Sequence, residues 1–148
     1  MKPLFLAAVL AVTGFAADRP LSVLVLDGMN NHDWEAGSRA IDSILTGSGR
    51  FRVEVCTWPC KPDFTHYDVV VSNLPAHRGQ QADNSAALEF IAGAPAHLRE
   101  GGAAWFVANK ALAYELPASR AFRRVRVAAA DARYKVLHCE DPVGERHR

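Results

Sequence analysis

Three short apolar runs are the feature of this sequence that most restricts its fold. They span Leu21 to Leu26, Tyr67 to Ser72 and Ala103 to Ala108, and Val, Leu and Ala dominate them. A strand with one solvated face alternates apolar and polar side chains. These runs are nearly continuous, as expected of strands buried on both faces of a parallel sheet. Because parallel strands need long crossover connections, the sequence predicts repeated strand–helix–strand units.

The stretches between these runs carry the signals of the other elements. Asp33 can cap a helix that ends at Gly47 and Gly49 and whose apolar face includes Gly37, Ala40, Ile41, Ile44 and Leu45. We further expect a strand over Phe51–Cys56, helices over Ser85–Leu98 and Tyr114–Ala121, and an antiparallel pair over Phe122–Val127 and Tyr134–Cys139. Pro95 should kink or shorten the helix that contains it.

A chain of 148 residues can bury one core but not two independent α/β domains. We therefore predict a single α/β domain over residues 18–148. Its expected architecture is a three-layer, doubly wound, mostly parallel sheet of the Rossmann or flavodoxin type, with an antiparallel C-terminal strand pair.

The amino terminus has the layout of a secretory signal. Lys2 precedes an apolar run from Leu4 to Val12, and small residues follow up to Ala16 and Ala17. We expect residues 1–17 to be removed on export, leaving an exported or periplasmic protein that is not bound to the membrane. Without processing, the protein would stay cytoplasmic. The alternative is that this run is a buried first strand or helix.

Formal charge gives little reason to expect a polyanionic partner, because the net value is +1. Basic residues do gather late in the chain, at Arg120, Arg123, Arg124, Arg126, Arg133 and Lys135. No aromatic residues interleave with them as a base-stacking platform would require. We interpret the cluster as a solvated face rather than an RNA contact, so a nucleic acid partner is not predicted.

The three cysteines are too few for a disulfide framework and do not complete a metal site. Cys56 and Cys60 can form a disulfide in an oxidising compartment. The favoured interpretation is a buried free thiol at the strand end and a further unpaired cysteine. A zinc site at Cys56, Cys60 and His66 would lack a second ligand pair. We predict no metal.

Polar residues follow each buried run, and the carboxyl ends of parallel strands form one crevice where ligands bind. The candidate ligand-binding residues on this edge are His32, Asp33, Trp34, Asn73, Pro75, His77 and Asn109. Each has a structural alternative: Asp33 as a helix cap, Trp34 as packing, and the two asparagines as turn residues. No catalytic residue is assigned, because the chain has no Gly-x-Ser-x-Gly elbow, Cys–His pair or phosphate-binding loop.

Residues from about 21 to 73 resemble the opening of the trehalose-utilisation (ThuA-like) family, whose fold is similar to that of class I glutamine amidotransferases. The resemblance is carried by Leu26-Asp-Gly-Met-Asn-Asn-His-Asp-Trp34, Ile44-Leu-Thr-Gly-Ser-Gly-Arg-Phe51 and Asp63-Phe-Thr-His-Tyr-Asp-Val-Val-Val71. It implies export and a sugar or glycoside ligand. The later part of that family has no counterpart here.

Residues from about 68 to 139 resemble the C-terminal part of the RsmC-like rRNA guanine-N2 methyltransferases. The carriers are Ser72-Asn-Leu-Pro-Ala-His77, His97-Leu-Arg-Glu-Gly-Gly102, Trp105-Phe-Val-Ala-Asn-Lys-Ala-Leu-Ala-Tyr-Glu115 and Tyr134-Lys-Val136. In that family an Asn-Pro-Pro-Phe motif accepts hydrogen bonds from the target amine and stacks the base. Asn73 and Pro75 match it, whereas Leu74 and Ala76 replace its second and fourth residues.

The S-adenosylmethionine (SAM) site implied by this second resemblance is not evident upstream. A Gly-rich turn should follow the first strand and an acidic residue the second. The chain instead has Asp27-Gly28-Met29-Asn30 and Thr57-Trp58-Pro59.

Our leading hypothesis is therefore an exported ThuA-like protein that binds a small polar ligand, such as a carbohydrate, without a cofactor. The alternative is an incomplete, inactive RsmC-like SAM-dependent methyltransferase relative. A hybrid or generated sequence without an evolved function is the third reading. The oligomeric state is not predicted.

Overall fold

The computed structural model describes residues 19–28, 33–57, 59–60, 67–75 and 84–143. Six strands form one sheet in the order β2-β1-β3-β4-β6-β5. Their bounds are β1 Leu21–Asp27, β2 Phe51–Thr57, β3 Tyr67–Asn73, β4 Leu98–Asn109, β5 Phe122–Ala130 and β6 Tyr134–Pro142. The first four strands are parallel, and β6 lies antiparallel between β4 and β5. The predicted α/β fold class is confirmed.

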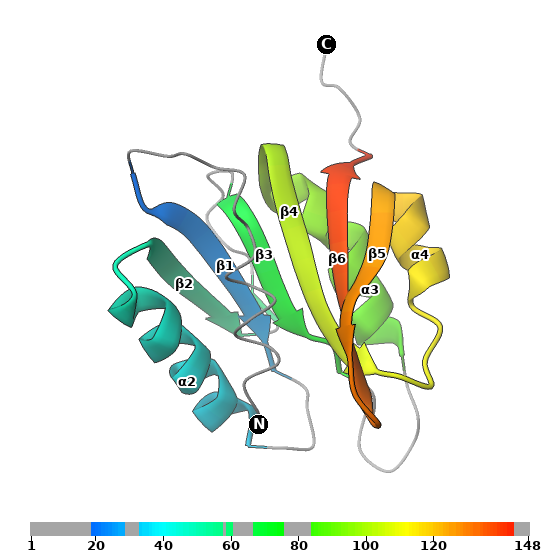
Figure 1. Ribbon diagram of the computed structural model, residues 1–148, viewed down its shortest axis with the longest axis horizontal. Coiled ribbons are helices and arrows are strands. Elements are labelled where there is room, and N and C mark those ends of the chain that lie inside the picture. The colour runs from blue at the N-terminus through cyan, green and yellow to red at the C-terminus, as the bar shows by residue number, and fades with distance from the viewer. Residues whose placement is uncertain (1–18, 29–32, 58, 61–66, 76–83, 144–148) are drawn as a thin grey trace.

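Helices cover the two faces of the sheet unequally. They are α2 (Trp34–Gly47), α3 (Ser85–Gly93), the 3₁₀ turn η1 (Ala94–His97) and α4 (Glu115–Ala121). Helix α2 lies on one side, against β1 and β2, whereas α3 and α4 lie on the other side (Figure 1). None of the helices in the described ranges is long and apolar enough to cross a membrane.

The central strands have apolar side chains on both faces, as their continuous runs predict. Val69, Val70 and Val71 of β3 are each fully buried. Alternate residues point to opposite faces, so Val70 joins the cluster beneath α3 and α4 while its two neighbours join the cluster on the α2 side. At about 25 cal/mol per Å² of apolar area, this double-sided burial is the main stabilising contribution of the strand.

Two helices differ from the sequence expectation. The predicted helix over Ser85–Leu98 ends at Gly93, and β4 already begins at Leu98. Pro95 lies in the 3₁₀ turn between them, where its missing N–H and fixed ring end the α-helical pattern. In α2, Leu45 is buried but Ile44 is 46% exposed, so the buried stripe is narrower than predicted.

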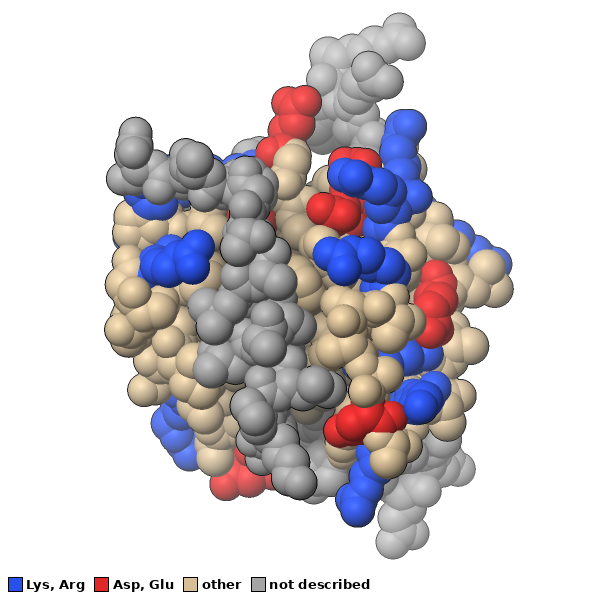
Figure 2. Space-filling model, viewed as in Figure 1, with Lys and Arg blue, Asp and Glu red and all other residues tan. Residues whose placement is uncertain are grey.

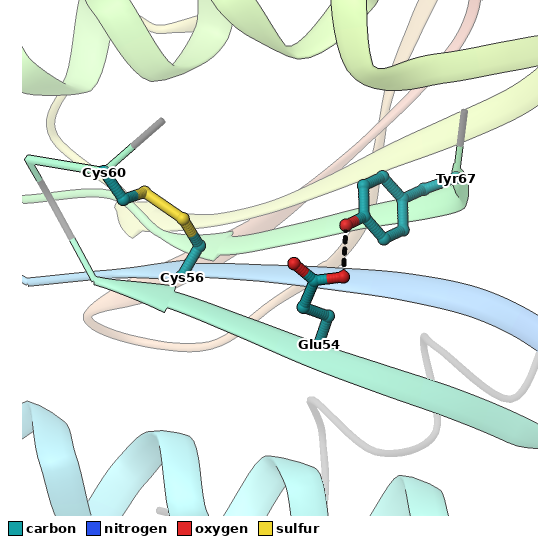
Figure 3. The surroundings of a disulfide bond; sticks show 4 residues. All are labelled: Glu54, Cys56, Cys60 and Tyr67. Carbon is teal, nitrogen blue, oxygen red and sulfur yellow. Dashed lines mark hydrogen bonds between the residues drawn. A yellow bond between two sulfur atoms is a disulfide. The ribbon is translucent and has the colours of Figure 1, made fainter. Parts of the chain in front are cut away.

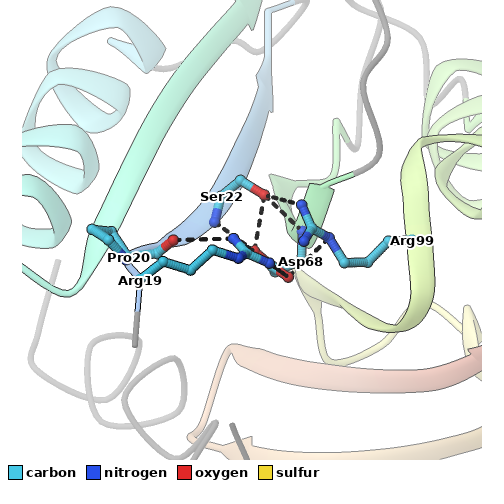
Figure 4. A network of polar contacts seen from close by, with 5 residues as sticks. All are labelled: Arg19, Pro20, Ser22, Asp68 and Arg99. Carbon is cyan, nitrogen blue, oxygen red and sulfur yellow. Dashed lines mark hydrogen bonds and ion pairs between the residues drawn. The ribbon is translucent and has the colours of Figure 1, made fainter. Parts of the chain in front are cut away.

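A buried carboxylate ties the amino-terminal edge of the sheet together (Figure 4). The side chain of Asp68, at the start of β3, is only 1% exposed. It accepts two hydrogen bonds of 3.0 Å from Arg19, one of 2.8 Å from the backbone N–H of Ser22, and pairs with Arg99 Nε at 2.9 Å. Burial alone would raise the pKa of Asp68, but the bonds from Arg19 and Ser22 and the charge of Arg99 outweigh it and lower the pKa.

We predict that Asp68→Asn lowers the free energy of unfolding by about 2–4 kcal/mol at pH 7, because it removes a charge that several donors share. Urea unfolding measures the loss. Since the pKa of Asp68 is lowered in the folded state, its contribution is present above the ordinary carboxyl pKa. It disappears as pH falls through the lowered value, so the two proteins should converge in acid.

The matched control is Glu35→Gln, which removes an acid from an exposed pair with Arg39 at 3.6 Å. This substitution should change the free energy of unfolding by less than about 0.5 kcal/mol. Equal losses of unfolding free energy in the two variants would contradict the assignment of Asp68 as the residue that holds this edge of the sheet together.

Candidate functional site

The carboxyl ends of β1, β3 and β4 meet at one edge of the sheet, called the strand-end rim below. Leu26 of β1 pairs with Ser72 of β3, so Asp27 lies beside Asn73. Asn73 in turn pairs with Val107 of β4, and Asn109 lies two residues further along that strand. The register therefore brings together polar residues that are far apart in the sequence, as the strand-end rule predicts.

Asp27 and Gly28 form the β1 part of the rim. Asp27 is 7% exposed, and its Oδ1 atom has no hydrogen-bond partner in the part of the chain that the structure describes. Gly28 follows with a φ of 102°, a conformation that glycine adopts without steric cost. A sharp turn and a buried acceptor oxygen thus lie where a ligand would approach the end of β1.

The β3 part of the rim is the tripeptide Asn73-Leu74-Pro75. Asn73 is half-buried and ends the strand, and Leu74 and Pro75 are buried. The N–H of Leu74 donates a 2.9 Å hydrogen bond to the carbonyl of Val107, which continues the β3–β4 ladder one residue past the strand. This bond and the burial of Leu74 hold the backbone of the tripeptide in place.

Two other candidates have structural partners. Asp33 caps α2, because its Oδ1 accepts a 3.0 Å hydrogen bond from the N–H of Ala36. Asn109 fixes the turn after β4 by accepting a 2.9 Å bond from the N–H of Ala111. Trp34 begins α2 and is half-buried. His32 and His77 lie outside the described residues.

Two polar pairs near the rim were not predicted. Tyr114 is 3% exposed, and its hydroxyl donates a 3.1 Å bond to Oδ1 of Asn84, the residue before α3. Lys135 of β6 is 5% exposed and bonds both carboxylate oxygens of Glu115, at 2.6 and 2.8 Å. The sequence expectation that Lys135 belongs to a solvated basic face is therefore wrong.

The Lys135–Glu115 pair connects α4 to the sheet. Burial raises the pKa of Glu115, but the hydrogen bonds and charge of Lys135 outweigh it, and the pKa is lowered. No sequence pattern pointed to this pair, because its members come from different elements and a lysine is seldom buried. Only the pairing of β6 with β4, which sets Lys135 opposite Ala108, places the ammonium group beneath α4.

The other basic residues of the late cluster behave as predicted. Arg123, Arg124 and Arg126 of β5 are exposed. Arg124 pairs with Asp141 at 2.7 Å. Figure 2 shows basic side chains mixed with acidic ones on this side of the molecule. The mixture weakens any general attraction of the β5 edge for a polyanion.

Cys56 and Cys60 form a disulfide at the carboxyl end of β2, with a Cα–Cα distance of 6.1 Å (Figure 3). The favoured expectation of a free thiol at Cys56 is therefore wrong. Nearby, the Tyr67 hydroxyl donates a 2.5 Å hydrogen bond to Glu54 and so joins β3 to β2.

Cys139 is free and buried, and burial raises the pKa of its thiol to about 12. In the described ranges no three His, Cys, Asp or Glu side chains gather as a metal site would require.

Similarity to a known protein family extends from residue 51 to residue 138. A family model described as the methyltransferase small domain matches residues 51–138, more than half of the chain. Ribosomal RNA small subunit methyltransferase C of Idiomarina loihiensis is 40% identical over 72 residues, which are 49% of this chain and 22% of the relative. Ribosomal RNA large subunit methyltransferase G of Streptomyces avermitilis is 37% identical over 70 residues, 47% of this chain and 18% of the relative. The chain thus spans about a fifth of these curated relatives.

Solved structures extend the likeness in fold to almost the whole chain. A T. thermophilus 16S rRNA N2 methyltransferase (RsmC), in complex with AdoMet and guanosine, matches with a TM-score of 0.65 and 22% identity, covering 95% of this chain and 43% of that one. A methyltransferase from Pyrococcus furiosus matches with a TM-score of 0.52 and 10% identity, covering 93% and 83%. At these identities the structures establish the fold alone.

These findings overturn the leading sequence hypothesis. The family match begins at residue 51, inside the segment assigned to a ThuA-like protein, so a change of family near residue 73 is not supported. Nothing in the comparisons supports a trehalose-utilisation protein or a carbohydrate ligand, and the prediction of a ThuA-like sugar-binding protein is wrong. The strand-end motifs that misled it are short segments of a fold architecture that many α/β families share.

We predict that Glu115→Gln destabilises the protein by about 1–3 kcal/mol at pH 7, because it leaves the buried Lys135 ammonium without its counterion. Adding Lys135→Met should restore most of the loss, since the double variant buries no charge. Urea unfolding of the four proteins in this cycle gives the coupling energy. Because the pKa of Glu115 is lowered, the stabilisation should vanish as pH falls through that value.

Glu100→Gln, at an exposed position, is the matched control and should leave stability unchanged. A double variant as unstable as Glu115→Gln alone would contradict the buried-pair account.

Proposed function

Because the chain belongs to the methyltransferase small domain family, we propose that it is an RsmC-like rRNA methyltransferase domain whose strand-end rim binds a guanine base. The observation that carries this proposal is the tripeptide Asn73-Leu74-Pro75 at the end of β3. It lies inside the matched region, and the N–H of Leu74 is hydrogen-bonded to the carbonyl of Val107. The curated relatives named for rRNA methylation support an RNA acceptor. The T. thermophilus neighbour, bound to guanosine, supports guanine as the base.

The chemistry of the tripeptide suits an amine acceptor. The exocyclic amine of guanine donates hydrogen bonds, and its lone pair is delocalised into the ring. Carbonyl oxygens from Asn73 and Pro75 would accept those hydrogen bonds, hold the nitrogen in place and increase its electron density. Methylation at nitrogen then releases one proton. The half-buried position of Asn73 strengthens these contacts, because the bonds form away from bulk water.

The chain departs from the family motif at the position that would stack the base. Ala76 stands where the family has Phe, and it has no ring on which a base can lie. Base–aromatic stacking contributes about 1–3 kcal/mol per base. We infer that the rim binds an isolated guanosine weakly and relies on further contacts with RNA for affinity.

The rim fits a SAM cofactor only in part. Gly28, with its positive φ, supplies one turn through which backbone can approach a ligand, and beside it the buried Oδ1 of Asp27 has no partner among the described residues. However, β2 ends at Thr57 instead of an acidic residue. The Cys56–Cys60 disulfide joins the end of this strand to the segment that follows it. The end of β2 therefore lacks the usual acidic partner of the cofactor ribose, and the described residues do not complete a cofactor site.

We predict that Asn73→Ala weakens binding of a guanine-containing RNA stem-loop by about 10-fold, because a buried polar contact contributes about 1–3 kcal/mol. Fluorescence anisotropy at fixed salt measures the change. Asn109→Ala is the matched comparison: it removes the same side chain from a turn, so affinity should change less than twofold. Equal losses in both variants, or none in either, would contradict the assignment of Asn73 as the acceptor contact.

We also predict that the isolated chain binds SAM weakly, with a dissociation constant above about 100 µM, or weaker than about −5.5 kcal/mol. Isothermal titration calorimetry with the cofactor alone is the direct measurement. Micromolar binding would contradict the partial fit and indicate that the chain holds a complete cofactor site. This result is independent of the RNA test, because the two ligands contact different strand ends.

A further inference from the structure

The β5–β6 turn places an exposed aromatic side chain at the strand-end rim. Tyr134, the first residue of β6, pairs with Asn109 of β4. Because β6 is antiparallel to β4, the turn before it lies at the same end of the sheet as the carboxyl ends of β1 and β3 (Figure 1). Tyr134 is 43% exposed, whereas the next five residues of its strand are buried. We call Arg133 and Tyr134 the Tyr134 patch.

Tyr134 and Asn73 lie on the same face of the sheet. Paired residues point to the same side, and so do alternate residues along a strand. Asn73 comes two residues after Val71 and Tyr134 two residues before Val136, and both valines belong to the apolar cluster on the α2 side. Strand β4 lies between β3 and β6, and Tyr134 is two residues further along the ladder than Asn73. Strand spacing and rise place their Cα atoms about 12 Å apart.

Hydrogen bonds hold the β5–β6 turn in place. Oδ1 of Asp131 accepts bonds of 2.7 Å from the backbone N–H groups of Tyr134 and Arg133. The bond from Tyr134, followed by that from Arg133, lowers the pKa of Asp131, so the carboxylate is ionised at neutral pH and keeps both bonds. The N–H of Lys110 donates a 2.8 Å bond to the carbonyl of Arg133, which extends the β4–β6 ladder past Asn109. The backbone of the Tyr134 patch is therefore fixed by its own contacts.

The side chains of the Tyr134 patch suit a single-stranded nucleic acid. Arg133 is exposed, and together with Lys110 it gives the turn two positive charges against the one carboxylate of Asp131. An aromatic ring stacks on a base, and a neighbouring guanidinium contacts a phosphate. In the sequence Tyr134 lies between Arg133 and Lys135, so an aromatic residue does interleave with the late basic cluster.

We propose that the Tyr134 patch binds the nucleotide that adjoins the target guanine, with Tyr134 stacked on its base and Arg133 paired with its phosphate. This inference rests on the proposed function and identifies the further RNA contact on which the rim relies. A separation of about 12 Å from Asn73 suits the neighbouring nucleotide of a strand whose bases are splayed apart. Asn109 lies between the two contacts, but its side-chain oxygen is bonded to the N–H of Ala111 and is not part of the patch.

Ring removal in the full chain tests the stacking contact. The probe is an RNA hairpin whose only unpaired guanine lies in its loop, titrated by fluorescence anisotropy. Tyr134→Thr keeps a β-branched residue in the strand but removes the ring, and it should weaken binding about 10-fold. Tyr134→Phe retains the ring and should change affinity less than twofold. Val127→Thr, at a similarly exposed position of β5, is the matched control and should leave affinity unchanged.

Abasic RNA identifies the base that the ring contacts. In two further hairpins, the nucleotide on one side or the other of the loop guanine is replaced by an abasic one. One of these changes should weaken wild-type binding about 10-fold but weaken Tyr134→Thr binding less than twofold, because that variant has already lost the stacking contact. Equal losses in the two proteins, or no loss with either hairpin, would overturn the proposal.

Salt dependence tests the phosphate contact independently. On a single strand each phosphate contact contributes about 0.7 to the slope of log affinity against log salt concentration. Arg133→Gln should reduce the slope by that amount and leave the turn intact, because the backbone N–H of Arg133 bonds Asp131. Arg123→Gln, at an exposed position near the start of β5, is the matched control and should not change the slope. Equal slopes in the two variants would overturn the proposal.

The same titrations separate this inference from the proposed function. If Asn73→Ala weakens binding and Tyr134→Thr does not, the inference is wrong while the proposed function stands. If only Tyr134→Thr weakens binding, the guanine contact of Asn73 is wrong and the Tyr134 patch stands as an RNA contact. A wild-type protein that does not bind the hairpin would overturn both. Each variant should melt within about 3 °C of the wild type, which shows that a loss of affinity is not a loss of fold.

Discussion

The structure depends on the burial of β3 on both of its faces. Its three consecutive valines fill the two apolar clusters that the sheet separates, and its neighbours β1 and β4 supply the hydrogen bonds of both edges. A strand in this position cannot shift its register by one residue without exchanging its two sets of side chains. The position of the strand-end rim is therefore a consequence of core packing.

The two ends of β3 show how this fixed strand serves different purposes. At its start, the buried carboxylate of Asp68 binds Arg19, Ser22 and Arg99, and these contacts connect β1 and β4 to β3. At its end, Asn73 is half-buried and the backbone of the next residue is still bonded to β4. The first end holds the sheet together. The second end presents polar groups from a rigid backbone, which is what the recognition of a planar base requires.

The comparison of sequence and structure shows why short motifs misled the functional interpretation. The sequence interpretation assigned the stretch around Asp27 to one family and the stretch around Asn73 to another, but only the methyltransferase assignment is supported. Both stretches lie at the ends of adjacent parallel strands in a single sheet. Turns after buried strands use few residue types, because they must leave the strand sharply and satisfy backbone groups. Similar short sequences at such turns indicate a shared fold architecture more strongly than a shared ligand.

The sequence by itself determined the α/β class, the three buried strands and the antiparallel C-terminal pair, whereas it left Asp33 open between a helix cap and a ligand contact. Each of these follows from local periodicity and turn chemistry. Only the tertiary structure decided that Lys135 is buried against Glu115, that Asp68 is the hub of the opposite edge, and that Trp105 stacks on His138. These contacts join residues from different elements, and their register is set by packing and strand order, which no local pattern encodes.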